Sequence, residues 1–359
     1  MGMSDKRERG MGRNAVLLLA VFFVSVLVLT AVIIHLRNCR DIRYAVTDLG
    51  AGDIGPYDIN DRGEILLYAI EDEGPSSILW KEASRTKLAI PEQDGLPAMP
   101  LGFDTCGNIL VIVGQQGAED SVQLGWDPAE GFFDLGYREI VNAIRHDPAV
   151  GSRSIEVWRI RNSSTAIGIT TSATQAEYHK GDAFFWTSSM GYIDLGGDVG
   201  GFGSAPKAAN EKGIVVGARY SGPKTDAFVW SATEGCELID PDRNESSFAW
   251  DINHKGQIVG AAFVTGGIQK VSNRLSVLLA FIFGKWVIPL DEPLHAFLWE
   301  DSQMIDLNRL IPARSGWELT CACAINNRGA IAGCGILHGE KRAFLLDPTE
   351  NQTPHRPPD

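Results

Sequence analysis

Residues 251–260 read DINHKGQIVG, which is a short apolar strand, a turn and the start of a second strand. At the turn, the side chain of Asn253 can hydrogen-bond to the backbone that follows it, and Gly256 can adopt the positive φ that such a turn requires. The flanking residues are apolar, β-branched or small, as in the strands of a hairpin. The stretch therefore predicts a tight β-hairpin in which Asn253 and Gly256 have structural roles.

The same phrase recurs along the chain, so the hairpin is one unit of a repeat. Clear copies occur at INDRGEIL, NEKGIVVG and NNRGAIAG, with the turn pairs Asn60 and Gly63, Asn210 and Gly213, and Asn326 and Gly329. Degenerate copies lie at Asp104 and around Arg161, where Ser164 replaces the glycine. Apart from two longer intervals, neighbouring copies are about 43 to 49 residues apart. The chain is therefore an array of six related units.

Each unit carries a second landmark, an aromatic strand followed by a strand that ends in Asp-Leu-Gly or a similar tripeptide. Examples are DAFFW at 182–186 with YIDLG at 192–196, and HAFLW at 295–299 with MIDLN at 304–308. With the turn hairpin, this gives four short strands per unit, the pattern of a β-propeller blade. The sequence thus predicts an all-β fold, a β-propeller of about six four-stranded blades over residues 44–347.

The first and last units are incomplete in complementary ways. The last aromatic strand, at residues 342–346, has no strand after it, whereas YAVTDLG at 44–50 has no hairpin before it. If residues 44–50 supply the missing outer strand, the ring closes without a free sheet edge. Residues 348–359 then form a tail that we expect to be disordered.

An insertion interrupts the fifth unit at residues 263–294. It contains LSVLLAFIFGKWVIPL at 275–290, whose apolar run is broken by Lys285 and Pro289 and falls short of a membrane span. AFIF at 280–283 repeats the pattern of the aromatic strand. The favoured interpretation is an extra hairpin or a partial seventh blade, and the alternative is a hairpin that touches a membrane.

The N-terminal segment predicts a transmembrane helix. Residues 15–34 carry no charge, and twenty residues at about 1.5 Å each span the roughly 30 Å hydrocarbon core of a bilayer. We assign a cytoplasmic tail to residues 1–14 and a membrane helix to residues 15–36. A cleaved signal peptide fits less well, because its apolar region would be shorter and followed by small residues. Cys39 does not fit a lipoprotein, because Arg37 and Asn38 precede it.

Charge favours an orientation and excludes one class of partner. Four basic residues precede the apolar segment and three follow it, which with the free amino terminus favours an extracytoplasmic location for the bulk of the chain. The formal net charge is −13, and no cluster of Lys and Arg follows residue 45. Nucleic acid is therefore not an expected partner.

Residues 44–50, the I-N-x-x-G-x-I-V-G copies and HAFLW at 295–299 resemble the HAF repeats of bacterial secreted and surface proteins. The resemblance covers residues 44–347. This chain departs from the pattern at Ser164 and in the aromatic strands SILW at 77–80 and LGW at 124–126. The resemblance implies an extracellular repeat domain and brings no catalytic motif with it.

Motifs that carry chemistry are few. The seven histidines have no metal-ligand spacing, and His295 is expected to make a hydrogen bond at the start of its strand. No nucleophile elbow or cofactor motif is present, so we expect no metal and no cofactor. The chain is interpreted as a non-enzymatic binding or structural surface module for an unknown protein or glycan. The alternative is a glycosidase or lyase in which Asp58 and Asp251, on the innermost strands, act as acid and base.

Three of the six cysteines lie within one hairpin. Cys321 and Cys323 share a face of one strand and Cys334 lies in the partner strand, so one of the two could form a disulfide with Cys334 outside the cell. Buried free thiols are the alternative. The spacing lacks a fourth ligand, so zinc is not expected.

Overall fold

The computed structural model describes residues 42–52, 54–71, 74–114, 121–162, 164–171, 181–222, 224–239, 245–263 and 294–349. The predicted membrane helix at 15–36, nearly all of the insertion at 263–294 and the tail beyond residue 349 lie outside the described residues. Among the residues described, no helix is both long enough and apolar enough to cross a membrane.

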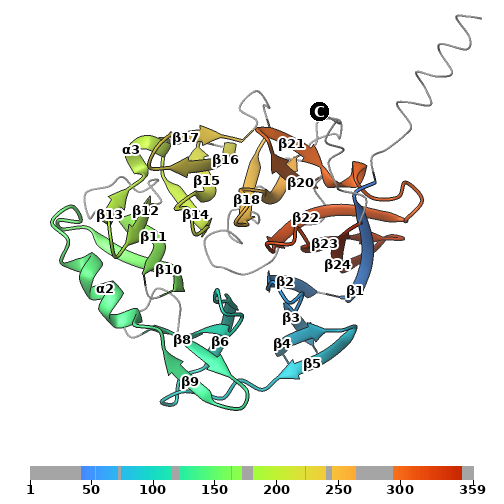
Figure 1. Cartoon of the computed structure of the whole chain (residues 1–359), viewed down its shortest axis with the longest axis horizontal. Helices are drawn as coiled ribbons and strands as arrows, with labels where there is room; N and C mark the ends of the chain where they lie inside the picture. The colour runs from blue at the N-terminus through green and yellow to red at the C-terminus, as the bar shows by residue number, and fades with distance from the viewer. Residues whose placement is uncertain are drawn as a thin grey trace, which may run out of the picture. The chain divides into compact units, whose positions relative to one another are not determined.

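The described strands form six antiparallel sheets of four strands each, arranged around a common centre (Figure 1). Blade I consists of β2 (Ile54–Ile59), β3 (Ile65–Glu71), β4 (Gly74–Lys81) and β5 (Ser84–Leu88), and blade II of β6 (Ala98–Phe103), β7 (Ile109–Val113), β8 (Val122–Asp127) and β9 (Gly131–Asp134). Blade III consists of β10 (Ser154–Asn162), β11 (Thr165–Thr171), β12 (Asp182–Thr187) and β13 (Gly191–Asp194).

Blade IV consists of β14 (Ser204–Ala209), β15 (Val215–Ser221), β16 (Lys224–Ser231) and β17 (Gly235–Leu238), and blade V of β18 (Ser247–Ile252), β19 (Ile258–Phe263), β20 (Leu294–Glu300) and β21 (Gln303–Asp306). Blade VI consists of β22 (Trp317–Ile325), β23 (Ile331–Leu337), β24 (Glu340–Pro348) and β1 (Tyr44–Ala51). The first strand of each blade lies innermost and the fourth at the periphery (Figure 1). The fold is a six-bladed β-propeller, as the repeat predicted.

Ring closure follows the predicted route. Strand β1 pairs antiparallel with β24, with Val46 opposite Leu346 and Asp48 opposite Phe344. The outermost strand of the last blade therefore comes from the start of the propeller sequence. Blade V is complete without the insertion, because β19 pairs directly with β20.

In four blades the glycine at the end of the hairpin motif faces a phenylalanine of the next strand. Gly168, Gly217, Gly260 and Gly333 stand opposite Phe184, Phe228, Phe297 and Phe344 in the ladders. The four rings are at most 2% exposed. A Cβ on Gly260 would overlap the carbonyl oxygen of Phe248 and lie 2.7 Å from the ring of Phe297. Blades I and II lack the glycine, and there the opposing side chains are the smaller Ile78 and Leu124.

The other residues of the aromatic strand also have defined roles. The alanines before the phenylalanines are fully buried. His295 Nδ1 lies 2.8 Å from Asp306 Oδ2 on the adjacent strand, so the expected hydrogen bond is confirmed. Burial works against the charge of Asp306, but hydrogen bonds from His295 and Asn308 outweigh it and lower the pKa of this carboxyl. In blade VI, Arg342 bonds to Asp48 in the same way.

The helices lie in connections between strands and were not predicted. Helix α2 (Tyr137–Arg145) joins blades II and III and accounts for one of the two long intervals in the repeat. It packs Ile140, Val141 and Ile144 into the core of blade III. The short helix α3 (Gly196–Val199) follows β13, and a 3-10 turn, η2 (Leu307–Arg309), follows β21.

We predict a graded response to alanine around the hairpin of blade V. Gly256 has φ of 91°, and a Cβ there would meet no atom within 4 Å, so Gly256→Ala should cost about 1–2 kcal/mol from backbone strain alone. In Gly260→Ala the new Cβ would overlap the backbone carbonyl oxygen of Phe248, so this variant should lose about 3 kcal/mol or more of unfolding free energy. Lys255 and His254 are exposed, so Lys255→Ala and His254→Ala are the controls and should change the free energy of unfolding by no more than about 0.5 kcal/mol. Denaturant unfolding measures the order, and equal losses at Gly256 and Gly260 would contradict it.

Candidate functional site

The strand order divides the connections between two faces of the ring. Turns between the first and second strands, and between the third and fourth, lie on one side, which we call the turn face. Connections between the second and third strands, and those between blades, lie on the other side, which we call the loop face. The chain enters at Arg43 and leaves at Thr349 on the turn face, where the backbone N–H of Thr349 donates to the carbonyl of Arg43 over 2.8 Å.

On the turn face, the repeated asparagine connects neighbouring blades. Its Oδ1 accepts the backbone N–H groups two and four residues on, as at Asn253 with Lys255 and Gln257 at 3.0 Å. Its Nδ2 donates to the backbone carbonyl of the next turn asparagine: Asn210 to Asn253, Asn253 to Asn326, and Asn326 to Asn60, over 3.0 to 3.1 Å. The turn glycines Gly63, Gly213, Gly256 and Gly329 have φ of 74° to 91°. The motif therefore closes a turn and bonds one blade to the next.

A β-bulge occurs at the same place in every innermost strand, three residues before the turn. The ladder registers shift around Tyr57, Leu101, Trp158, Lys207, Trp250 and Cys323. We call this place the bulge position. A bulge redirects a side chain and is frequent beside functional sites. Five residue types occupy the bulge position, with tryptophan in two blades, whereas asparagine recurs at the turn in four of the six blades.

Three bulge-position side chains from consecutive blades meet at the centre of the ring. The amine of Lys207, from blade IV, lies 4.9 Å from the ring centroid of Trp158 in blade III and 5.3 Å from that of Trp250 in blade V. The surrounding protein atoms remove water from the amine and lower the pKa of Lys207 to about 7. Because Lys207 faces the axis of the ring, it keeps some accessible surface. The arrangement is a lysine amine between two indole rings, which attract its charged form.

The carboxylates considered as catalytic, Asp58 and Asp251, lie one residue beyond the bulge and occupy equivalent positions. Asp58 accepts the backbone N–H of Ile59 through Oδ1 at 2.8 Å and that of Phe103, in the next blade, through Oδ2 at 2.9 Å. Asp251 does the same with Ile252 and with Ile325 of the next blade, both at 2.9 Å. Each carboxylate therefore bonds its own blade to the next.

Arg159 of blade III crosses the centre and pairs with Asp58 of blade I. Burial disfavours its charge, but the carboxylates of Asp58 and Asp251 outweigh this effect and raise the pKa of the guanidinium. Gly102 makes room for the pair, because a Cβ there would overlap both side chains. Asp58 is thus paired with a guanidinium as well as hydrogen-bonded, and Asp251 is hydrogen-bonded.

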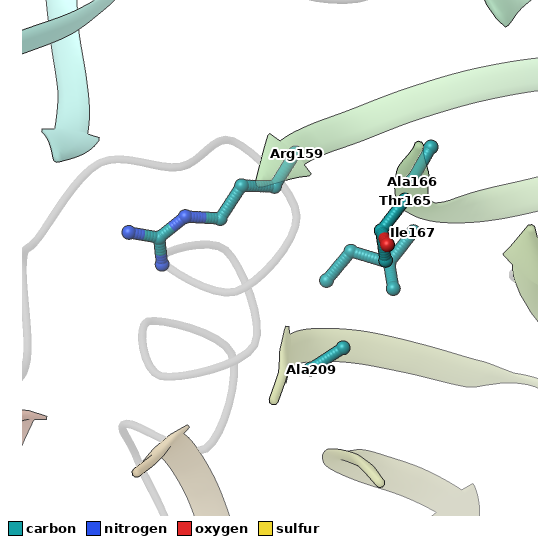
Figure 2. A pocket seen from close by; sticks show the side chains of 5 residues that line it. All are labelled: Arg159, Thr165, Ala166, Ile167 and Ala209. Carbon is teal, nitrogen blue, oxygen red and sulfur yellow. The ribbon is translucent and has the colours of Figure 1, made fainter. Parts of the chain in front are cut away.

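A small depression lies between blades III and IV and is lined by Arg159, Thr165, Ala166, Ile167 and Ala209. Figure 2 shows the guanidinium of Arg159 directed away from the other four side chains. Apart from Arg159 and Thr165 the lining is apolar, and it lies where the turn asparagine is missing from blade III. It offers no group suited to acid or base chemistry.

The three cysteines of blade VI lie together on the inner side of the blade. The sulfurs of Cys321 and Cys323 are 3.7 Å apart, and Cys321 stands opposite Cys334 in the ladder. All three are free thiols. Across the part of the chain that the structure describes, no three His, Cys, Asp or Glu side chains are arranged to hold a metal ion.

Sequence reasoning found the turn residues and the two inner carboxylates but missed Trp158, Arg159 and Lys207. These three belong to degenerate or unremarkable parts of the repeat. One signal was available: aligning the units on the turn residue places Trp158, Lys207 and Trp250 in one column. Their meeting at the axis follows from the ring and not from local sequence.

Comparison with known proteins adds little on function. No family model matches the sequence, and no curated protein matches it. Among solved structures, TolB from Acinetobacter baumannii is 12% identical, with a TM-score of 0.39, over 86% of this chain and 55% of its own. The β-propeller domain of the Trilobed protease from Pyrococcus furiosus is 10% identical, with a TM-score of 0.43, over 82% of this chain and 84% of its own.

YCF48, in a structure with bound D1 peptide, is 12% identical, with a TM-score of 0.38, over 87% of this chain and 96% of its own. This chain spans about half of the TolB chain. Similarities at this level carry no argument about ligand or activity.

We predict that the axial carboxylates contribute to stability. In Asp251→Asn one of the two accepting oxygens is replaced by an NH2 group, which cannot accept a hydrogen bond, so one backbone N–H loses its partner. The free energy of unfolding in urea should therefore fall by about 1–3 kcal/mol. Asp127→Asn is the matched control, because Asp127 accepts two backbone N–H groups through Oδ1 alone, and it should lose no more than about 0.5 kcal/mol. An unchanged or stabilised Asp251→Asn variant would contradict the structural role, since catalytic groups often reduce stability.

Proposed function

We propose that the chain is a HAF-repeat protein held in a membrane by residues 15–36, and that its extracytoplasmic propeller is a binding or structural surface module without enzymatic activity. The repeat motifs at residues 44–347 and the uncharged segment at 15–34 support the proposal. The fold agrees with a binding or structural role but does not by itself specify one.

The observation that carries the non-enzymatic assignment is the bonding of Asp58 and Asp251. An acid and a base for glycoside cleavage must each reach the substrate, one to donate and one to accept a proton or attack. Here both oxygens of each carboxylate accept backbone N–H groups, and Arg159 pairs with Asp58. A glycosidase or lyase built on these two residues is therefore disfavoured.

The loop face is the favoured binding surface. It lies on the side of the ring opposite Arg43 and Thr349, where the described chain enters and leaves the propeller. Three of the five large apolar side chains that are exposed among the described residues lie at its strand ends or connections: Ile70, Met99 and Phe202, at 52%, 49% and 59% exposure. The expected ligand is a protein or a glycan, because the net charge of −13 disfavours nucleic acid.

We predict that deleting residues 1–36 converts a detergent-requiring protein into a soluble β-rich one. The propeller closes through β1, which begins at Tyr44, so the deletion removes no strand. Ultracentrifugation of cell extracts and circular dichroism of the soluble fraction measure the outcome. If the truncated protein still sediments with membranes, the insertion at 263–294 is a second membrane contact; a full chain that is soluble without detergent would refute the anchor.

The face assignment predicts a position-dependent crosslink. A photoreactive phenylalanine analogue at Met99 or Phe202 of the full chain should form adducts in the intact cells that make it. The same analogue at Met190 is the matched control, because Met190 is equally exposed, at 52%, but lies on the turn face between β12 and β13. Adducts are resolved by electrophoresis and mass spectrometry. Adducts at Met190 alone, or at none of the three positions, would contradict a loop-face binding surface.

A further inference from the structure

The thiol cluster of blade VI has a geometry that differs from what strand register alone suggests. In the β22–β23 ladder, Cys321 stands directly opposite Cys334, which would make these two the natural cross-strand pair. Cys323 lies at the bulge position, where the register shifts between Ala322 and Ala324. The bulge turns its side chain between the other two, since Cys323 contacts both Cys321 and Cys334.

Residues of the two neighbouring blades pack against the three cysteines on two sides. Cys321 and Cys323 pack against Ala261 and Leu294 of blade V, and both are at most 3% exposed. On the other side, the thiol of Cys334 lies 3.6 Å from the carbonyl oxygen of Ile54 in blade I. The cluster therefore sits where the last blade of the ring meets both of its neighbours.

We propose that Cys323 is the obligatory member of a disulfide with Cys334, formed while the propeller folds, and that this bridge fixes the blade that closes the ring. The proposal rests on the extracytoplasmic location proposed above, because disulfides persist in oxidising compartments. Cys321 then remains as a buried thiol.

The chemistry is a thiol–disulfide exchange with a small-molecule disulfide such as oxidised glutathione. The thiolate of one cysteine attacks a glutathione sulfur, which breaks the S–S bond and releases one glutathione thiolate. The second cysteine loses its proton, attacks the mixed disulfide and releases the second glutathione. Two protein thiols and one glutathione disulfide thus become one protein disulfide and two reduced glutathione molecules.

Burial explains why the bridge belongs to folding. In the folded protein, contact with Cys321 and burial raise the pKa of Cys323 well above its ordinary value, and contact with Cys323 and burial do the same for Cys334. Few thiolates are then present, and Cys323 is only 3% exposed. Oxidation should therefore be faster during refolding than on the folded, reduced protein.

Tryptic peptides make the connectivity directly readable. Cys321 and Cys323 lie in the peptide 315–328, and Cys334 lies in the peptide 329–341. The purified full chain is refolded with oxidised and reduced glutathione, alkylated, digested without reduction and analysed by tandem mass spectrometry. We expect the two peptides to be linked, with fragment ions that place the link at Cys323.

Variants separate the alternatives. Cys321→Ala should retain the link, Cys323→Ala should lose it, and Cys106→Ala, which removes an exposed cysteine of blade II, is the matched control that retains it. Reducing the bridge should lower the Tm of the full chain by about 5 °C. A link that persists in Cys323→Ala, fragment ions that place it at Cys321, or an internal Cys321–Cys323 bridge in the unmodified chain would overturn the proposal, as would the absence of any bridge.

This test is independent of cell location. The glutathione buffer supplies the oxidising conditions, so failure of the membrane anchor, which fractionation detects, leaves the connectivity result unchanged. Conversely, a missing bridge in the purified protein refutes the thiol proposal and leaves the binding role untouched.

Discussion

The pairing of β1 with β24 is the constraint on which the rest of the structure depends, because it joins the two ends of the propeller sequence in one sheet. Without it, blade VI would have three strands and an exposed edge. Closing so long a loop is entropically costly, and the contacts that reward closure form only when the ring is complete. These contacts include Asn326 with the carbonyl of Asn60, and Asn327 with Asp61.

Once the ring is closed, each conspicuous repeat residue has a structural role. The turn asparagine caps its own turn and bonds to the next blade, the glycine of the second strand admits a phenylalanine ring, and the alanine of the aromatic strand is fully buried. The aspartate that begins Asp-Leu-Gly accepts the backbone N–H two residues on, as Asp194 does from Gly196, and the following leucine is buried. The repeat signature is thus a description of blade geometry and does not specify a ligand.

The sequence was sufficient for the blade count, the strand order and the closure, because period, turn chemistry and a missing strand at each end are local patterns. It was also sufficient to locate Asp58 and Asp251 on inner strands. It was insufficient for their role, since the N–H groups of Phe103 and Ile325 that they accept lie in neighbouring blades. Helix α2 was missed because the repeat gives no information about a connection between blades. Trp158, Lys207 and Trp250 share one place in the repeat, but their meeting depends on the bulge at that place and on the ring, which local sequence does not predict.

The departures from the repeat show which joints between blades differ from the others. The chain of turn asparagines joins blades IV, V, VI and I, but blade II has Asp104 at the turn and blade III lacks the turn asparagine.

At the joints between blades I and II and between blades II and III, other side chains make the contacts. Gln123 replaces the usual alanine of the aromatic strand, is 1% exposed and bonds through its amide to Val157, Trp158 and Ile160 of blade III. Arg62 reaches from blade I to the carbonyl of Gly107 in blade II. Trp158, which contacts Lys207, and Arg159, which pairs with Asp58, lie on the strand that Gln123 contacts. Loss of the turn motif is therefore not what places side chains at the centre of the ring: Trp158 lies in blade III, which lacks the turn asparagine, whereas Lys207 and Trp250 lie in blades IV and V, which keep it.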